Sequence, residues 1–159
     1  MARECWPEQT YEWPEISLGL ILGSGTITSP REIASHNEQQ ANRERRVRNS
    51  KGATRLIQII TTESAHMLWV LRCERVIREK RHTDNEIRSR WRSAINARLT
   101  DDKITTATKI KRDKNLTNLI KATWEPLLRK QGEIPENWLE DSEVLVGRRM
   151  QTTMRSKRS

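Results

Sequence analysis

The longest apolar pattern lies in the middle of the chain, from about Thr54 to Lys80. Its apolar positions are Leu56, Ile57, Ile59, Ile60, Ala65, Met67, Leu68, Trp69, Val70, Leu71, Cys73, Val76 and Ile77. Between residues 56 and 71 they project around most of a helical wheel, and a helix that is apolar on nearly every side must be enclosed by other elements. The pattern predicts one long central helix, which Lys80 and Arg81 suit as a C-terminus.

A second helix is predicted to begin at the sequence Thr83-Asp84-Asn85-Glu86. Thr83 and Glu86 have the spacing of a capping box, in which each side chain accepts a hydrogen bond from the backbone of the other. Behind this cap, Ile87, Trp91, Ala94 and Ile95 form one apolar stripe at helical spacing. This helix is therefore expected to pack on the central helix through a single face.

Helical spacing continues beyond residue 100. Thr100 is a plausible N-cap for a further helix opened by Asp101 and Asp102. Apolar positions recur from residue 104 to 128, and Pro126 is predicted to kink or split that segment because proline removes an amide donor. Residues 133–146 are predicted to lie as a strap across the bundle.

The flanking segments lack helical periodicity. Residues 1–30 contain Pro7, Pro14 and Pro30, and residues 16–22 could form a short strand or a helical turn. Residues 31–53 are predicted to be a mobile basic linker, with partial helix as an alternative, and residues 147–159 a disordered basic tail. The expected fold is all-α, a small helical bundle at 54–146 around one long central helix, preceded by an irregular segment at 1–53.

Charge is distributed unevenly along the 159 residues. The net charge is +9, and residues 41–130 alone carry 23 basic and 10 acidic side chains. An excess of this kind favours a polyanionic partner, here RNA or DNA, although a well-solvated helical surface would look the same. The candidate nucleic-acid-binding residues are Arg43, Arg45, Arg46, Arg48, Arg88, Arg90, Arg92, Lys109, Lys111 and Arg112. No groove-reading motif is present, so binding is expected to be non-specific.

Several classes of protein are excluded. Cys5 and Cys73 are the only cysteines, too few for a disulfide framework and too far apart for a zinc knuckle. The first residues do not form a signal peptide, and no apolar run approaches the roughly 20 residues that cross a bilayer. We expect an intracellular protein, nuclear or cytoplasmic, without a membrane partner.

Candidate catalytic and metal-binding groups have structural explanations. Glu63, Ser64, His66 and Cys73 are close in sequence, but neighbouring positions on a helix point in different directions and a third orienting group is missing. His66 and Cys73 would be only two of the four ligands that zinc normally takes. The sequence therefore predicts no cofactor and no enzymatic activity.

Two further features also have competing interpretations. The adjacent Asp101 and Asp102 could belong to a two-metal nuclease, but acids at a helix start are favoured electrostatically. The chain has six tryptophans and no phenylalanine, so tryptophans are expected to be the large anchors of the core. Trp91 lies between arginines, as a base-stacking residue would, but it also falls on the apolar stripe and is predicted to be buried.

Three stretches resemble a known protein family: residues 13–25, 55–100 and 123–149. They contain WPEISLG at 13–19, ILG at 21–23, ESAHMLWVLRCERVI at 63–77, RW at 90–91, NARLT at 96–100 and TWEP at 123–126. These motifs are similar to the C-terminal region of basidiomycete non-LTR retrotransposon proteins, which carry reverse transcriptase and ribonuclease H domains. The resemblance implies a segment downstream of the enzyme domains and of a Cys/His zinc-binding motif. It transfers no catalytic residue to this chain.

Three functional hypotheses follow. The leading one is a non-catalytic accessory module, or remnant, of a retroelement protein that aids nucleic-acid binding. The second is a scaffold or oligomerisation module, with the central helix buried against a partner protein or a second copy. The last is an enzyme of ribonuclease H type, for which the sequence shows neither the strands nor the carboxylate set.

Overall fold

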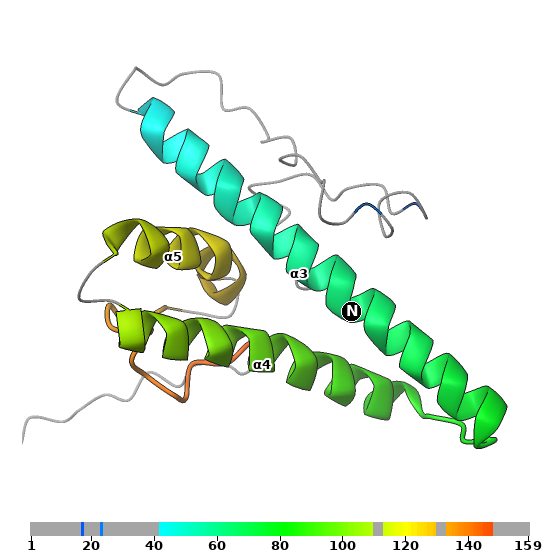
Figure 1. The fold of residues 1–159 in the computed structure, drawn as a ribbon. Coiled ribbons are helices and arrows are strands. Elements are labelled where there is room, and N and C mark those ends of the chain that lie inside the picture. Colours follow the sequence, from blue (N-terminus) through cyan, green and yellow to red (C-terminus); the bar gives the residue numbers. More distant parts are fainter. Residues whose placement is uncertain (1–16, 18–22, 24–41, 110–112, 130–132, 148–159) are drawn as a thin grey trace, which may run out of the picture.

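The computed structural model describes Ser17, Gly23 and residues 42–109, 113–129 and 133–147. This part of the chain contains three helices: α3 at Asn42–Ile77, α4 at Asp84–Lys109 and α5 at Lys114–Arg129 (Figure 1). Residues 133–147 follow without a helix or strand. The predicted all-α class is confirmed, and among the described residues no helix is long and apolar enough to span a bilayer.

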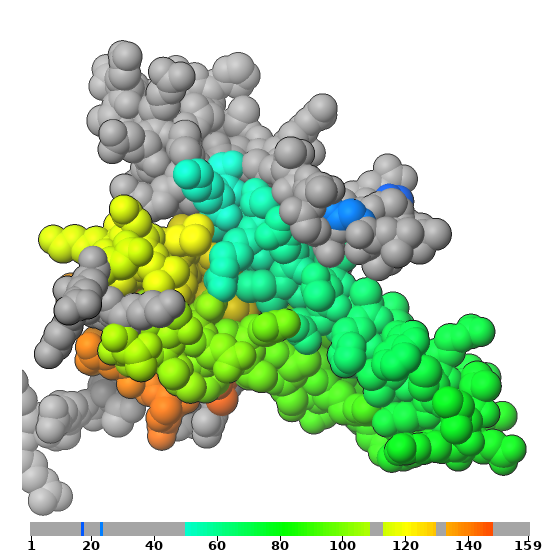
Figure 2. Space-filling model, viewed as in Figure 1, coloured from blue at the N-terminus to red at the C-terminus, as the bar shows by residue number. Residues whose placement is uncertain are grey.

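The helices form a bundle at one end and a two-helix arm at the other. α4 returns alongside α3, and the short α5 lies between the first half of α3 and the second half of α4 (Figure 1). The second half of α3 and the first half of α4 continue beyond α5; we call this part, residues 66–92, the arm. In the space-filling view the arm projects away from the rest of the molecule (Figure 2).

The core lies where all three helices meet. Its buried apolar side chains are Ala53, Leu56, Ile57 and Ile60 of α3, Trp91, Ile95 and Leu99 of α4, Ile120, Trp124, Leu127 and Leu128 of α5, and Trp138, Leu139, Val144 and Val146 of the segment that follows. Trp91, Trp124 and Trp138 are thus core anchors, as expected. Burial of these large side chains supplies most of the driving force that holds the helices together.

The first prediction that the structure corrects concerns α3. It begins at Asn42, so residues 42–53 are helical, which agrees with the alternative of a partly helical segment and not with an irregular linker over that stretch. The polar sequence gave no apolar period, but a helix already fixed by its packed portion extends easily through good helix formers such as arginine and glutamate. The helix also ends at Ile77 rather than at Lys80.

The enclosure of α3 is also only partly as predicted. Its first half is buried in the bundle, but on the arm Leu68, Trp69, Val76 and Ile77 are 60%, 63%, 69% and 77% exposed. In this region α4 is the only other described helix beside α3, so of the described elements one covers one face of α3 and none covers the opposite face (Figure 1). The central helix is therefore not wrapped along its whole length.

α4 is a single helix, and the predicted new start after Thr100 is wrong. Thr100 Oγ1 donates to the carbonyl of Asn96, one turn back, instead of capping a helix. Asp101 and Asp102 consequently lie in the interior of α4. The predicted capping box at the true start is confirmed, because the Thr83 amide donates to Glu86 Oε2 at 2.8 Å and the Glu86 amide to Thr83 Oγ1 at 3.3 Å.

α5 has its own cap, which the sequence analysis missed. Asp113 Oδ1 accepts hydrogen bonds from the amides of Asn115 and Leu116, so α5 begins there. Pro126 lies inside α5, and the helix is not split at that position. The amide missing at Pro126 is the one that would donate to the Ala122 carbonyl.

Gly52 of α3 lies against that same carbonyl. A Cβ atom added at Gly52 would be 2.5 Å from the carbonyl oxygen of Ala122. Real Cβ atoms do not approach backbone so closely, so glycine is needed for α3 and α5 to pack at this distance.

Residues 133–147 cross the bundle as the predicted strap. Asn96 holds the end of the strap, accepting from the Val146 amide at 2.7 Å and donating to the Val146 carbonyl at 3.2 Å. The ammonium of Lys103 donates to the carbonyls of Asp141 and Val144 at 2.6 and 2.8 Å. Burial among these groups lowers the pKa of Lys103. The strap is therefore fixed to α4 by polar contacts as well as by its buried side chains.

Candidate functional site

A concave surface lies at the tip of the arm. It is an open groove of about 560 Å³ between the end of α3, the connecting residues 78–83 and the start of α4. Its lining comprises Leu71, Arg72, Arg75, Val76, Lys80, Arg81, His82 and Ile87. We call it the tip groove.

The tip groove combines an apolar base with a cationic rim. Leu71, Val76 and Ile87 supply the apolar contacts. The cationic side chains are exposed, and none forms an ion pair with another described residue; they are Arg72, Arg75, Lys80 and Arg81. Their charges are therefore available to a bound anion, while their aliphatic stems can lie along the apolar base.

Glu74 lies on α3 between Arg72 and Arg75, and its carboxylate is paired within the arm. Its carboxylate accepts two hydrogen bonds from Arg90, at 2.7 and 3.1 Å, and lies 2.5 Å from His82 Nε2. The hydrogen bonds from Arg90 lower the pKa of Glu74 to about 2, so the carboxylate stays ionised. The bidentate geometry joins α3 to α4 at the tip, so this carboxylate is paired with Arg90 and not with a rim cation.

The connection between the two helices is also well defined. The amide of Lys80 donates to the carbonyl of Glu74 at 3.2 Å, and Glu79 between them has φ of 54°. A residue in the left-handed conformation directly after the last turn is a common way for a helix to end. This ending of α3 and the capping box at Thr83 and Glu86 at the start of α4 together define the path of the chain that lines the groove.

An exposed aromatic side chain lies on α3 about one helical turn before the tip groove. Trp69, Arg72 and Val76 are spaced i, i+3 and i+7, so they share one face of α3. Trp69 is 63% exposed, and the nearest ring to it is that of His66, with centroids 6.2 Å apart. The arm thus presents an exposed aromatic ring about one helical turn from Arg72.

The ten residues predicted to bind nucleic acid are distributed as follows. Arg88 and Arg92 are exposed on α4 in the arm, whereas Arg90 is the partner of Glu74. Arg43, Arg45, Arg46 and Arg48 lie on the first turns of α3, and Lys109 is the last residue of α4, with side chains outside the described part. Lys111 and Arg112 lie outside the described residues altogether.

The four rim cations were missed as site residues at the level of the sequence. In the sequence, Arg72 and Arg75 are interpreted as part of the polar half of a helix. Lys80 and Arg81 are interpreted as its C-terminal end, where positive charge is favourable. The available signal was the short spacing between that end and the next capping box, which makes the chain turn back at once. That turn brings Ile87 opposite Leu71 and creates the concave surface.

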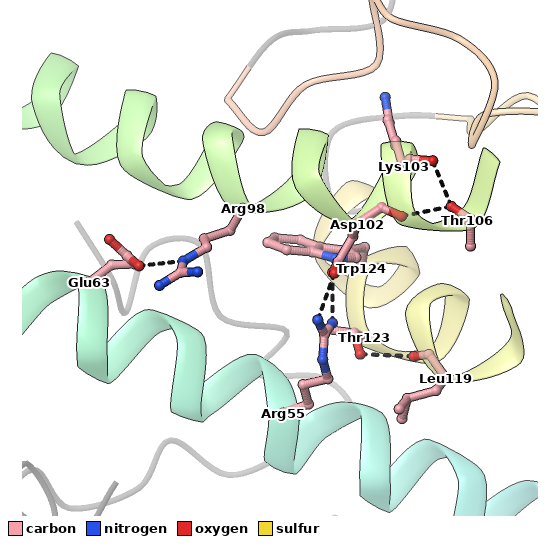
Figure 3. Close-up of polar contacts among 9 residues, drawn as sticks. All are labelled: Arg55, Glu63, Arg98, Asp102, Lys103, Thr106, Leu119, Thr123 and Trp124. Atoms are coloured by element: carbon pink, nitrogen blue, oxygen red, sulfur yellow. Dashed lines mark hydrogen bonds and ion pairs between the residues drawn. The ribbon is translucent and has the colours of Figure 1, made fainter. Parts of the chain in front are cut away.

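The other candidate groups have structural partners (Figure 3). Asp102 accepts two hydrogen bonds from Arg55 at 2.7 Å and one from the Trp124 indole at 2.6 Å, joining α3, α4 and α5. Glu63 of α3 is paired with Arg98 of α4. Ser64 accepts from the indole of the buried Trp91 at 2.9 Å. Among the described residues there is no group of three or more His, Cys, Asp or Glu side chains that could hold a metal ion.

Comparison with known proteins adds no relative. No protein-family model matches the chain, and neither a curated protein nor a solved structure is significantly similar to it.

Proposed function

We propose that this chain is a non-catalytic helical module that binds RNA or DNA without sequence preference through the tip groove. The observation that carries the proposal is the rim of four cations without ion-pair partners on a projecting arm. Lysine and arginine at such positions displace the counterions of a phosphate backbone, which is the main source of non-specific affinity. Arg88 and Arg92 on α4 would extend the contact, whereas the arginines at the start of α3 lie at the opposite end of that helix.

The proposal places the protein inside the cell, in the nucleus or the cytoplasm, where its polyanionic partner occurs. An accessory role in a retroelement protein, which the sequence resemblance implies, is compatible with such a module. The proposed binding rests on the charges of the arm and does not depend on that lineage.

Salt dependence tests the proposal directly. Fluorescence anisotropy with a labelled oligonucleotide should show binding at about 50 mM salt. Four phosphate contacts alone predict that affinity falls about 50-fold to 150-fold between about 50 and 200 mM salt. The variant carrying Arg72→Gln, Arg75→Gln, Lys80→Gln and Arg81→Gln should lose most of that dependence.

A matched control removes the same net charge from the other end of the molecule. It carries Lys51→Gln, Lys114→Gln, Lys121→Gln and Arg129→Gln, all distant from the tip groove. Its affinity should remain within about threefold of the wild type at low salt, since only long-range attraction is lost. Equal weakening by both variants would show that binding follows net charge and not the tip groove, and no binding by the wild type would end the proposal.

A second candidate function is a scaffold or oligomerisation module. It is favoured by the exposed apolar side chains of the arm, Leu68, Trp69, Val76 and Ile77. Such side chains on one helix are a common feature of protein interfaces. Size-exclusion chromatography with light scattering distinguishes the two functions, because a monomer at all concentrations argues against self-association.

A further inference from the structure

We infer that Trp69 is a stacking platform for a base of single-stranded RNA or DNA whose phosphates lie along the rim of the tip groove. The inference rests on the proposed function and specifies its ligand: an unpaired strand is preferred to a duplex. Three observations carry it, namely the exposure of Trp69, its position beside the cations, and the charge of the surface around it.

Trp69 differs from every other described tryptophan. Trp91, Trp124 and Trp138 are no more than 2% exposed, and each indole N–H donates to a protein side chain. Trp69 is 63% exposed, and no hydrogen-bond partner of its indole occurs among the described residues. A ring that could bury 150–250 Å² on average is therefore left largely in contact with water.

The position of Trp69 links this ring to the tip groove. Arg72, three residues further along α3, lies about one turn away and lines the groove. Arg75 also lines the groove, but it lies about 120° around the helix from Trp69. A strand whose base lies on the ring of Trp69 can therefore place the adjoining phosphate beside Arg72 and then follow the groove to Arg75. This combination of an aromatic face and a cationic track is the usual basis of single-strand binding.

Charge selects a nucleic acid over a second copy of the chain as the occupant of this face. A second copy docked on this face would add the cations of its own arm, Arg72 and Arg75 among them, to those already present. Like charges brought together in this way oppose association, whereas a polyanion supplies the opposite charge. A duplex satisfies the cations equally well, but its bases are stacked on each other and offer no face to Trp69.

The test compares Trp69→Ala with the wild type on a single-stranded oligo(dT) of about 12 nucleotides and on a duplex of equal length. Loss of one stacked base should weaken single-strand binding about 5-fold to 150-fold and leave duplex binding within about twofold. Trp69→Phe, which keeps an aromatic face, should retain most of the affinity. Ile77→Ala, which removes another exposed side chain of the arm, is the matched control and should have no effect.

The outcomes separate the inference from the proposed function. If the wild type binds neither probe at low salt, the proposed function fails. If it binds both and Trp69→Ala weakens both equally or neither, only the stacking platform is overturned. A change in molar mass by light scattering on Trp69→Ala would identify the face as a self-association surface and would also overturn the inference. Unchanged helical circular dichroism confirms that the variant is folded.

Discussion

Replacing Asp102 by alanine should separate the two interactions that this carboxylate makes at the centre of the bundle. In the wild type it accepts from Arg55 of α3 and from Trp124 of α5 (Figure 3). Trp124 is completely buried, so without Asp102 its indole N–H has no acceptor, at a cost of about 1–3 kcal/mol. The side chain of Arg55 is 31% exposed and can return to water, so losing that ion pair should cost only about 1 kcal/mol. The expected total is about 2–4 kcal/mol.

Asp102→Asn provides the comparison. Its single amide oxygen can still accept from the Trp124 indole, while the interaction with Arg55 is weakened. This variant should therefore lose only about 1 kcal/mol, close to the effect of Arg55→Met. Urea unfolding followed by circular dichroism measures all three variants, provided the dependence on urea stays the same. If Asp102→Asn were as unstable as Asp102→Ala, or Arg55→Met more unstable than either, the ion pair and not the indole would dominate.

Three further predictions concern single positions. Gly52→Ala should destabilise the fold by about 1–3 kcal/mol in urea unfolding, although alanine favours helix, because its Cβ would overlap Ala122; an unchanged midpoint would contradict the packing. Thr83→Ala should cost about 0.5–2 kcal/mol by removing the acceptor for the Glu86 amide, whereas Thr83→Ser should cost little. The pKa of Glu74 is depressed from 4.5 to about 2, so the stability it contributes is present above pH 4.5 and lost as pH falls toward 2. The free energy of unfolding of Glu74→Gln should therefore lie below that of the wild type at neutral pH and approach it as the pH falls from 4.5 toward 2. A difference that does not change with pH would show that the ionised carboxylate paired with Arg90 does not contribute this stability.

The fold was predictable wherever a local pattern and its packing agree. The capping box at Thr83 and Glu86 and the stripe of Ile87, Trp91 and Ile95 could be read from spacing alone, because a helix start and a buried face each leave a short-range signature. The start of α3 could not be read in this way, since no buried face marks its polar first turns. The sequence did not predict that α4 continues past residue 100. An acid such as Asp102 is typical of a helix start, and its partner Arg55 lies 47 positions earlier in the sequence.

The site was harder to predict because it depends on what does not pack. The apolar pattern at Leu68, Trp69 and Val76 indicates burial, yet no other described element covers α3 beyond the bundle, and this depends on the length of α5. Basic composition singled out Arg88 and Arg92, which lie on the arm. It could not distinguish Arg90, which is bound to Glu74, from Arg72 and Arg75, which are not, because that distinction requires the partner across the helix pair.

The contact of Gly52 with Pro126's turn determines how far along α3 the helix α5 lies. Each residue is unfavourable in a helix interior, glycine by about 1 and proline by about 3 kcal/mol relative to alanine. Pro126 cannot donate to the carbonyl of Ala122. In the observed alignment that carbonyl lies against Gly52, which has no side chain. Sliding α5 by one turn, about 5.4 Å, would bring a side chain against that carbonyl instead. Gly52 and Pro126 each lower the stability of their own helix, but together they disfavour every position of α5 along α3 except the observed one.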